Sequence, residues 1–267
     1  MKSFLPERIV CLTEETVETL YLLGQQHRIV GVSGYAVRPP QVRREKPRVS
    51  AFTSADLPKV TALKPDLVLT FSDLQADIAA AFIREGIAVH AFNQRDIAGI
   101  LAMIKTLGAL TDCVDAAASL VSELTARIEA IKNHSRPVSM RPRVYFEEWD
   151  EPMISSIRWV SELIEIAGGE EVFSAKSVMQ AAKDRVVTAA EVIAAQPDIV
   201  IASWCGKKFA PERFKVRPGF DQIPAVRTGQ LHEIKAPLIL QPGPAALTDG
   251  LDAMSNIIAN WIAENQH

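Results

Sequence analysis

Cysteine is scarce in this chain, and its scarcity argues against a protein held together by disulfides or zinc. The 267 residues contain three cysteines, Cys11, Cys113 and Cys205, which are far apart and form no CxxC pair. No cysteine–histidine spacing typical of zinc ligands occurs either. We therefore expect free thiols and no metal site, although one disulfide would also be compatible with the sequence.

Long apolar runs are missing as well. No stretch reaches the roughly 18–20 apolar residues that cross a bilayer. The segment Met1–Arg8 has a basic residue but lacks the apolar core of a secretory signal, and Ile9–Leu12 is typical of a first strand. The sequence predicts a protein that does not span a membrane, and a cytoplasmic one if Met1 is the native start.

A strong excess of one charge is also lacking. Lys and Arg number 29 against 32 Asp and Glu, which gives a net charge of −3 and a pI near 6.0. Nucleic-acid binding needs a basic surface, so we expect no such partner. The apolar content of 48% is ordinary for a globular chain of this length, which can bury a core without staples.

Motifs of catalysis and phosphate binding are absent. The chain contains no GxGxxG, no GxxxxGK[ST] and no GxSxG. None of the five histidines pairs with another at short spacing, and we expect neither His90 nor His232 to bind a metal. Four acids surround Trp149 in the run 147–151, but neighbours on a strand or loop point in alternating directions. We predict no enzyme, no catalytic residue and no catalytic cofactor.

The chain contains one pattern twice. Residues 62–71 read Ala-Leu-Lys-Pro-Asp-Leu-Val-Leu-Thr-Phe, and residues 194–203 read Ala-Ala-Gln-Pro-Asp-Ile-Val-Ile-Ala-Ser. Each copy is a helix end, a Pro-Asp pair and an apolar run, and the offset is 198 − 66 = 132 residues. Arg8 and Arg143 each begin a further apolar run. The repeat predicts two similar lobes with a ligand cleft between them.

Apolar runs alternate with helical patterns, which predicts an α/β fold with parallel sheets covered on both faces. We expect strands at 8–12, 29–32, 67–69, 88–91, 143–146 and 199–202, and helices at 16–24, 60–63, 78–85, 113–132, 159–167, 191–195 and 247–264. Residues 38–48 and 147–152 are expected to be connections. The domains expected are an N-terminal lobe (1–110), a connecting helix (111–135) and a C-terminal lobe (136–267).

Four segments carry a family resemblance: Val30–Tyr35, Pro39-Pro40, Asp56–Phe71 and Leu163–Phe173. They are similar to those of the helical-backbone (class III) substrate-binding proteins of ABC importers, most of all to the cobalamin-binding branch. The resemblance implies two Rossmann-like lobes joined by one long α-helix, with cobalamin or a related metal chelate held at the carboxyl ends of the strands, where open α/β sheets bind ligands. It also implies a periplasmic location and a partner ABC permease, and we expect a monomer.

Candidate ligand-binding residues are aromatic or polar and lie just beyond strand ends. A corrinoid is a flat, mostly apolar disc rimmed by amides, and aromatic side chains bury much of such a surface at low entropic cost. By resemblance, Tyr35 follows the Gly-Val-Ser stretch, Phe52 stands where the family commonly has tryptophan, and Trp204 follows the second Pro-Asp strand. The full set is Tyr35, Phe52, Phe71, Trp149, Trp204 and Gln241. Each has an alternative: Phe52 and Phe71 could be core, Tyr35 and Trp204 surface packing, and Trp149 part of a solvated loop.

The resemblance also implies an acidic docking residue on each lobe for the permease. The matching first-lobe position holds Pro58, so Asp56 is the nearby substitute, and Glu212 is the candidate in the second lobe. Three other functions stay open: a binder of an iron–siderophore, haem or another metal chelate on the same fold, a two-lobed enzyme or metallocluster-handling protein, and a cytoplasmic sensor or scaffold.

Overall fold

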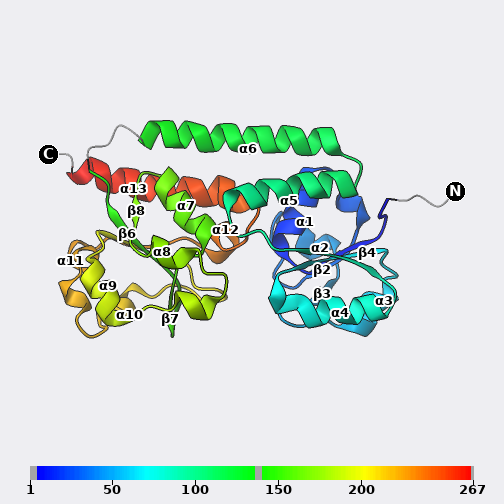
Figure 1. Cartoon of the computed structure of the whole chain (residues 1–267), viewed down its shortest axis with the longest axis horizontal. Coiled ribbons are helices and arrows are strands. Elements are labelled where there is room, and N and C mark those ends of the chain that lie inside the picture. Colours follow the sequence, from blue (N-terminus) through cyan, green and yellow to red (C-terminus); the bar gives the residue numbers. More distant parts are fainter. Residues whose placement is uncertain (1–4, 136–139, 266–267) are drawn as a thin grey trace. The chain divides into compact units, whose positions relative to one another are not determined.

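The protein is described from a computed structural model, which covers residues 5–135 and 140–265 (Figure 1). The chain divides into two compact units. Unit 1 consists of Met1–Gln94 and Ala98–Glu123, and unit 2 consists of Arg95–Ile97 and Leu124–His267. Each unit contains one five-stranded sheet, so the prediction of two α/β lobes is confirmed.

The sheet of unit 1 is wholly parallel, with strand order β3-β2-β1-β4-β5. All residues of the central strands β1 and β4 are buried, as expected for a sheet covered on both faces. The bounds are β1 (Ile9–Cys11), β2 (Ile29–Ser33), β3 (Arg48–Ser50), β4 (Leu67–Phe71) and β5 (Ala88–Phe92). The short strand β3 was missed, because it lies at the end of the Pro- and Arg-rich segment expected to be a connection.

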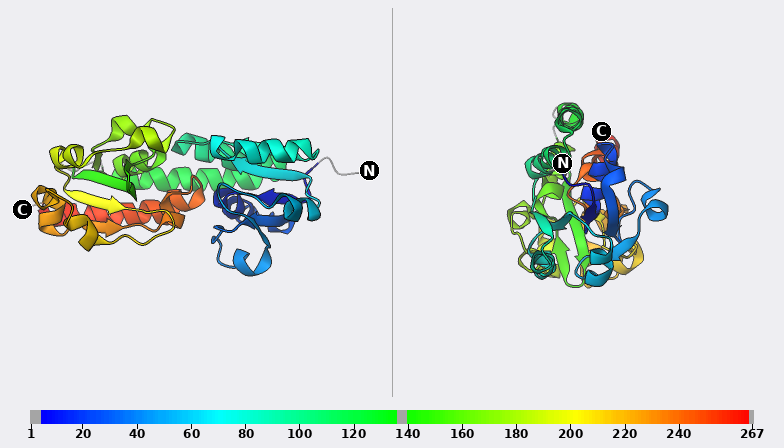
Figure 2. Two further views of the ribbon diagram at one scale, coloured as in Figure 1. Left: turned by 90° about the horizontal axis from the view of Figure 1, so that it is seen from below. Right: turned by 90° about the vertical axis from the view of Figure 1, so that its right-hand side faces the viewer.

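The sheet of unit 2 has strand order β10-β9-β6-β7, and β8 pairs with the start of β6. It is parallel except for β7, which forms an antiparallel hairpin with β6. The bounds are β6 (Arg143–Asp150), β7 (Met153–Ser155), β8 (Glu170–Glu171), β9 (Ile199–Ala202) and β10 (Leu231–Glu233). The expectation that residues 147–152 form a loop was wrong, since β6 runs on to Asp150. Helices of this unit lie on both sides of its strands, with α13 on one side and α8 and α9 on the other (Figure 2).

Helices connect the strands in the expected alternation. The α-helices are α1 (Glu14–Leu22), α2 (Val42–Glu45), α3 (Leu57–Ala62), α4 (Ala76–Arg84), α5 (Ile97–Leu110), α6 (Val114–Ser135), α7 (Arg158–Ile166), α8 (Ser174–Ser177), α9 (Ala189–Ala195), α10 (Pro211–Lys215), α11 (Pro224–Thr228), α12 (Ala236–Ile239) and α13 (Leu251–Asn265). The 3-10 turns are η1 (Gln26–Arg28), η2 (Asp73–Gln75), η3 (Ala182–Arg185) and η4 (Phe220–Gln222), and η5 (Ala246–Gly250) is a π-helical turn. The predicted helix at 113–132 is α6, which extends to Ser135.

The Pro-Asp repeat has the same structural role in both units. The Asp66 carboxylate accepts the backbone N–H of Arg8 at 3.0 Å, and the Asp198 carboxylate accepts the N–H of Arg143 at 2.8 Å. In return, the N–H groups of Asp66 and Asp198 donate to the carbonyls of Arg8 and Arg143. Both Pro-Asp pairs follow a non-glycine residue with positive φ, 49° at Lys64 and 43° at Gln196. Each Asp thus fastens the end of a helix to the start of the unit's first strand.

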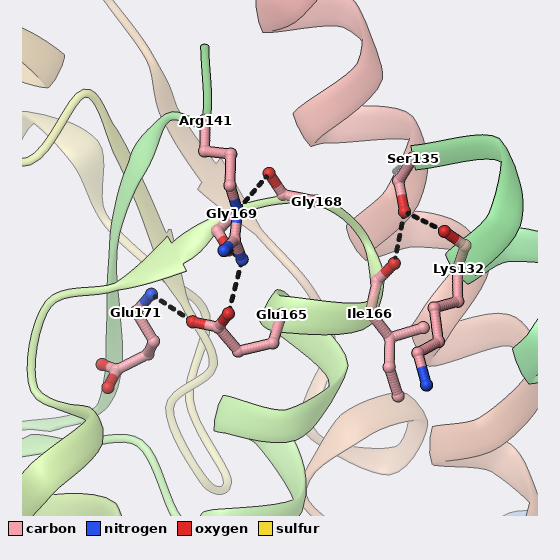
Figure 3. A network of polar contacts seen from close by, with 8 residues as sticks. All are labelled: Lys132, Ser135, Arg141, Glu165, Ile166, Gly168, Gly169 and Glu171. Atoms are coloured by element: carbon pink, nitrogen blue, oxygen red, sulfur yellow. Dashed lines mark hydrogen bonds and ion pairs between the residues drawn. The ribbon is translucent and has the colours of Figure 1, made fainter. Parts of the chain in front are cut away.

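Within unit 2, a polar network holds the C-terminal end of α6 against the end of α7 (Figure 3). The Ser135 hydroxyl donates to the Ile166 carbonyl at 2.7 Å, where α7 ends. The next residues form a glycine turn in which Gly168 has a φ of +94°, and a Cβ there would lie 3.0 Å from the Ser135 Cβ. Arg141 contacts the Gly169 carbonyl and the Glu165 carboxylate. Gly168 is therefore required both by its backbone conformation and by the close approach of α6.

Two simple expectations can be compared directly with the structure. All three cysteines are free. Across residues 5–135 and 140–265, no helix combines the length and the apolarity needed to cross a bilayer.

Candidate functional site

Two large apolar side chains that follow strands of the unit 1 sheet are exposed. Tyr35, just past β2, is 51% exposed, and Leu74, just past β4, is 58% exposed. Phe52, which follows β3, is half-buried. The positions are consistent with the predicted ligand-binding role of Tyr35 and Phe52, which stays a prediction. Sequence reasoning missed Leu74 because it considered only aromatic and polar residues beyond strand ends.

The buried amide of Gln75 connects two of the predicted site residues. Its Nε2 donates to the carbonyl of Phe52 at 2.8 Å and to that of Leu12 at 3.3 Å. Its Oε1 accepts the N–H of Phe71 at 3.0 Å. Phe71 itself is only 6% exposed, so it can offer a ligand no more than an edge. Gln75 therefore fixes the backbone position of Phe52 relative to the central strands β1 and β4.

The loop that carries Tyr35 is fastened to α1 by an ion pair. Arg38 Nε lies 2.8 Å from the Glu18 Oε1 atom, and the Glu18 side chain is 11% exposed. The N–H of Tyr35 donates to the Ser33 hydroxyl at 3.2 Å. These contacts hold the backbone on both sides of Tyr35 while its ring stays exposed, which is the arrangement expected of a pre-organised contact residue.

Two buried carboxyls follow the central strand of unit 1. Burial raises the pKa of Glu14 to about 7. Burial, together with the neighbouring charge of Glu14, raises the pKa of Glu15 to about 8, against the opposing effect of its hydrogen bond from Thr13. The Thr13 hydroxyl donates to Glu15 Oε1 at 2.7 Å. Both carboxyls therefore hold a proton more tightly than an exposed glutamate does.

The acidic run of unit 2 is occupied by three ion pairs. Glu147 and Glu148 pair with Arg217 and Arg185, each with a closest distance of 2.6 Å. Asp150 pairs with Lys207. The three cations come from segments well beyond β6, so the pairs join the carboxyl end of this strand to three later parts of the unit. Three of the four acids in the run 147–151 therefore already have a cationic partner, and only Glu151 has no ion pair with another described residue.

Glu147 has the most contacts of the three acids. Besides both terminal nitrogens of Arg217, its carboxylate accepts the Tyr145 hydroxyl and the Trp204 Nε1–H, each at 3.1 Å. Burial raises the pKa of Glu147, while the hydrogen bonds and charge of Arg217 oppose that rise. The Trp204 ring packs edge-on against Phe209 with centroids 5.1 Å apart and is 3% exposed. Trp204 is thus mainly a core residue.

Lys207 brings Trp149 and Trp204 together. Its Nζ lies 4.2 Å from the centroid of the Trp149 ring and 5.1 Å from that of Trp204, distances typical of cation–π contacts. Trp149 is half-buried on β6, and its Nε1–H donates to the Glu151 carbonyl at 2.8 Å. Trp149 therefore belongs to the hairpin and not to a solvated loop.

A cavity of about 490 Å³ lies beside these residues, within unit 2. Its apolar wall includes Met153, Val187, Ala189 and the buried Trp204, and its charged lining is Asp150, Glu151, Arg213 and Arg217. This volume falls within the range of small-molecule sites. The two arginines were not anticipated, since they lie within and just after α10, away from any strand end.

The remaining candidates are not among the residues that line the cavity. Gln241 is half-buried between α12 and η5. Asp56 is the N-cap of α3 and accepts the Lys59 N–H at 3.0 Å, while Glu212 on α10 is 83% exposed. Burial lowers the pKa of both His90 and His232. In the part of the chain that the structure describes, no three His, Cys, Asp or Glu side chains gather as metal ligands would.

Comparison with known proteins decides the family. The model of the periplasmic binding protein family matches residues 9–238. The chain belongs to this family. It is a substrate-binding protein of the class III type, the predicted family, whose members bind substrates for transport and are typically periplasmic.

Several relatives have names that specify a ligand. The chain is 26% identical to the cobalamin-binding protein of Halobacterium salinarum over 96% of this chain and 70% of that protein. It is 27% identical to the vitamin B12-binding protein of Vibrio campbellii over 74% of this chain and 70% of that protein. Among solved structures, the periplasmic vitamin B12 binding protein of Vibrio cholerae matches with a TM-score of 0.77 and 20% identity, covering 97% of this chain and 99% of the other. The periplasmic heme-binding protein of a Roseiflexus species matches with a TM-score of 0.80 and 21% identity, covering 94% and 99%.

Proposed function

We propose that this protein binds a corrinoid, without chemistry of its own, for ABC-type import or handling. The observation that carries the proposal is the exposure of Tyr35 and Leu74, which lie just beyond β2 and β4 and are more than half exposed, while Phe52 beyond β3 is half-buried. Ligands of open parallel α/β sheets bind beyond the carboxyl ends of the strands, which is where these exposed apolar side chains lie. A large, flat, mostly apolar ligand suits such a surface.

The relatives support a corrinoid over other ligands. The curated relatives are named as cobalamin- or vitamin B12-binding proteins, and one of these matches covers 96% of the chain. The ion pairs of Glu147, Glu148 and Asp150 favour a binding role, since three of the four acids in the run 147–151 are already neutralised by cations of the same unit. On this proposal, Tyr35, Phe52, the edge of Phe71, Trp149, Trp204 and Gln241 contact the ligand.

Haem or another iron chelate is the second candidate. The observation that favours it is the match to solved heme-binding proteins, whose TM-scores of 0.80 to 0.82 are as high as that of the vitamin B12-binding structure. Haem differs from a corrinoid in carrying carboxylates at one edge and in needing axial ligation of its iron. The two ligands can therefore be separated by direct titration.

Calorimetric titration of the purified protein with cyanocobalamin, and separately with haemin, tests the proposal. We expect saturable one-to-one binding of cyanocobalamin together with quenching of tryptophan fluorescence, because Trp149 and Trp204 are among the residues proposed to contact the ligand. Tyr35→Ala should weaken binding about tenfold, whereas Leu22→Ala, at an apolar side chain of similar exposure on α1, should not. Binding of haemin alone would transfer the proposal to the second candidate.

For docking to a permease we propose Asp56 and Glu212. Both are exposed, which is the condition for pairing with cations of a membrane subunit. If they dock, Asp56→Asn combined with Glu212→Gln should lower uptake in a reconstituted transport assay and leave cyanocobalamin affinity unchanged. Unaltered uptake would remove both residues from the docking surface.

A further inference from the structure

The cavity of unit 2 can hold one part of a corrinoid but not the whole molecule. Its volume is about 490 Å³, and all of its lining residues belong to unit 2. A corrinoid consists of a macrocycle with several side-chain arms, and its volume is much larger. If the protein binds such a ligand, the cavity has the size for a single arm.

Two of the four charged residues that line the cavity are in ion pairs with other described residues, and the other two are not. Asp150 is paired with Lys207, and Arg217 is paired with Glu147. Glu151 and Arg213 remain, one of each sign, and both are exposed. Neither of these two side chains forms an ion pair or hydrogen bond with another described residue, so each is available to a ligand.

A single opposite pair of free charges restricts the chemistry of the occupant. An anionic group would be attracted by Arg213 but repelled by Glu151. A cationic group would be attracted by Glu151 but repelled by Arg213. A primary carboxamide avoids both penalties, because its oxygen accepts hydrogen bonds from a guanidinium while its NH₂ donates to a carboxylate. Met153, Val187 and Ala189 supply apolar contacts for the methylene stem of such an arm.

We infer that this cavity binds a neutral carboxamide arm of the ligand and discriminates against the corresponding carboxylic acid. Glu151 and Arg213 are the specificity-determining residues. The inference rests on the proposed function, and it deepens that function by assigning one ligand group to one subsite. It also favours amide-rimmed corrinoids over chelates whose rim carries free carboxylates.

The test compares cyanocobalamin with its monocarboxylates, in which one side-chain amide is hydrolysed, with each isomer tested separately by calorimetry. The wild-type protein should bind at least one isomer about tenfold more weakly than the amide, because the acid places a negative charge near Glu151. The discrimination ratio is the dissociation constant of this monocarboxylate divided by that of cyanocobalamin. Glu151→Gln should lower this ratio about fivefold or more, and Arg213→Gln should raise it. Lys208→Gln is the matched control, since it removes an exposed positive charge of the same segment that does not line the cavity.

The outcomes separate the inference from the function on which it rests. Opposite shifts of the ratio in Glu151→Gln and Arg213→Gln, with none in Lys208→Gln, would support the subsite. Binding of cyanocobalamin with the same ratio in all four proteins would overturn the subsite and leave the proposed function intact. A wild-type protein that binds none of these corrinoids would overturn both. Because both mutated residues are exposed, the variants should fold, and circular dichroism checks this.

Discussion

Both terminal nitrogens of Arg217 bind the Glu147 carboxylate, at 2.6 and 3.0 Å, and the Glu147 side chain is wholly buried. Glu147 lies on β6, and Arg217 comes just after α10, 70 residues later. The guanidinium also packs 4.7 Å from the centroid of the Phe214 ring. This contact fixes one wall of the unit 2 cavity against the central strand of the sheet.

Removing one member of this pair should be costly. We expect Arg217→Ala to lower the free energy of unfolding by about 3–5 kcal/mol, because it leaves a buried carboxylate without its cation. Replacing both members in Glu147→Leu/Arg217→Met should restore part of the loss. Urea unfolding followed by tryptophan fluorescence measures both effects. A single variant as stable as the wild type would show that Glu147 is solvated or protonated in the folded state.

Stability should fall as the pH rises through neutrality. The folded-state pKa values of Glu14 and Glu15, about 7 and about 8, lie above the ordinary value of 4.5, so the folded protein holds protons that the unfolded chain releases. The stability that these protons contribute is complete below pH 4.5 and is lost as the pH rises to about 8. Glu15→Gln should flatten this dependence, by on the order of 3 kcal/mol between pH 5 and 8.

The control for this prediction is Glu191→Gln. Hydrogen bonds from Thr188 and Lys176 lower the pKa of Glu191, so it titrates below the pH window in question. Thermal unfolding of the three proteins from pH 5 to 8 gives the comparison. Parallel curves for the wild type and Glu15→Gln would mean that the buried carboxyl stays ionised.

Leu74 should contribute to ligand affinity without contributing to stability. It is 58% exposed, so Leu74→Ala should change the free energy of unfolding by less than about 0.5 kcal/mol. If a ligand covers it, the same change should weaken cyanocobalamin binding by about 1–2 kcal/mol. Ile83→Ala is the control, because Ile83 is 61% exposed on α4 and lies away from the strand ends. Equal affinities of the two variants would place Leu74 outside the ligand surface.

The glycine turn at the end of α7 should not tolerate a side chain. We expect Gly168→Ala to destabilise the protein by about 2–3 kcal/mol, since the new Cβ would meet Ser135 and the φ of +94° is unfavourable for alanine. Gly229→Ala provides the comparison, because Gly229 has a φ of +75° with nothing within 4 Å of a Cβ. Gly229→Ala should lower the free energy of unfolding by less, about 1 kcal/mol. Similar decreases in the free energy of unfolding of the two variants would show that Ser135 on α6 can shift to make room for the new Cβ.

The sequence predicted those parts of the fold that local patterns determine. The Pro-Asp repeat and the long helix α6 could be identified because each rests on residues close together in the chain. The short strands β3, β7, β8 and β10 were missed, since none of them is a wholly apolar run like the three residues of β1. Their pairing depends on contacts with distant strands.

The candidate site was less predictable for the same physical reason. Tyr35 was chosen by its position after a strand, and it is exposed there. Trp204 was chosen by the same rule but is buried, and its ring contacts Phe209, Lys207 and Glu147. The cationic partners of the acidic run could not be identified from the sequence, since no local pattern links Glu148 to Arg185 or Asp150 to Lys207.

These ion pairs constrain how the chain can change over evolution. Glu147, Glu148 and Asp150 each pair with a cation 37 to 70 residues further along the chain. A mutation that removes one partner leaves the other charge unpaired, which favours a second mutation that removes it. Related sequences that lack Glu148 should also lack Arg185, and the same holds for Glu147 with Arg217. We therefore expect the acidic residues of β6 and three distant basic residues to change together when related sequences diverge.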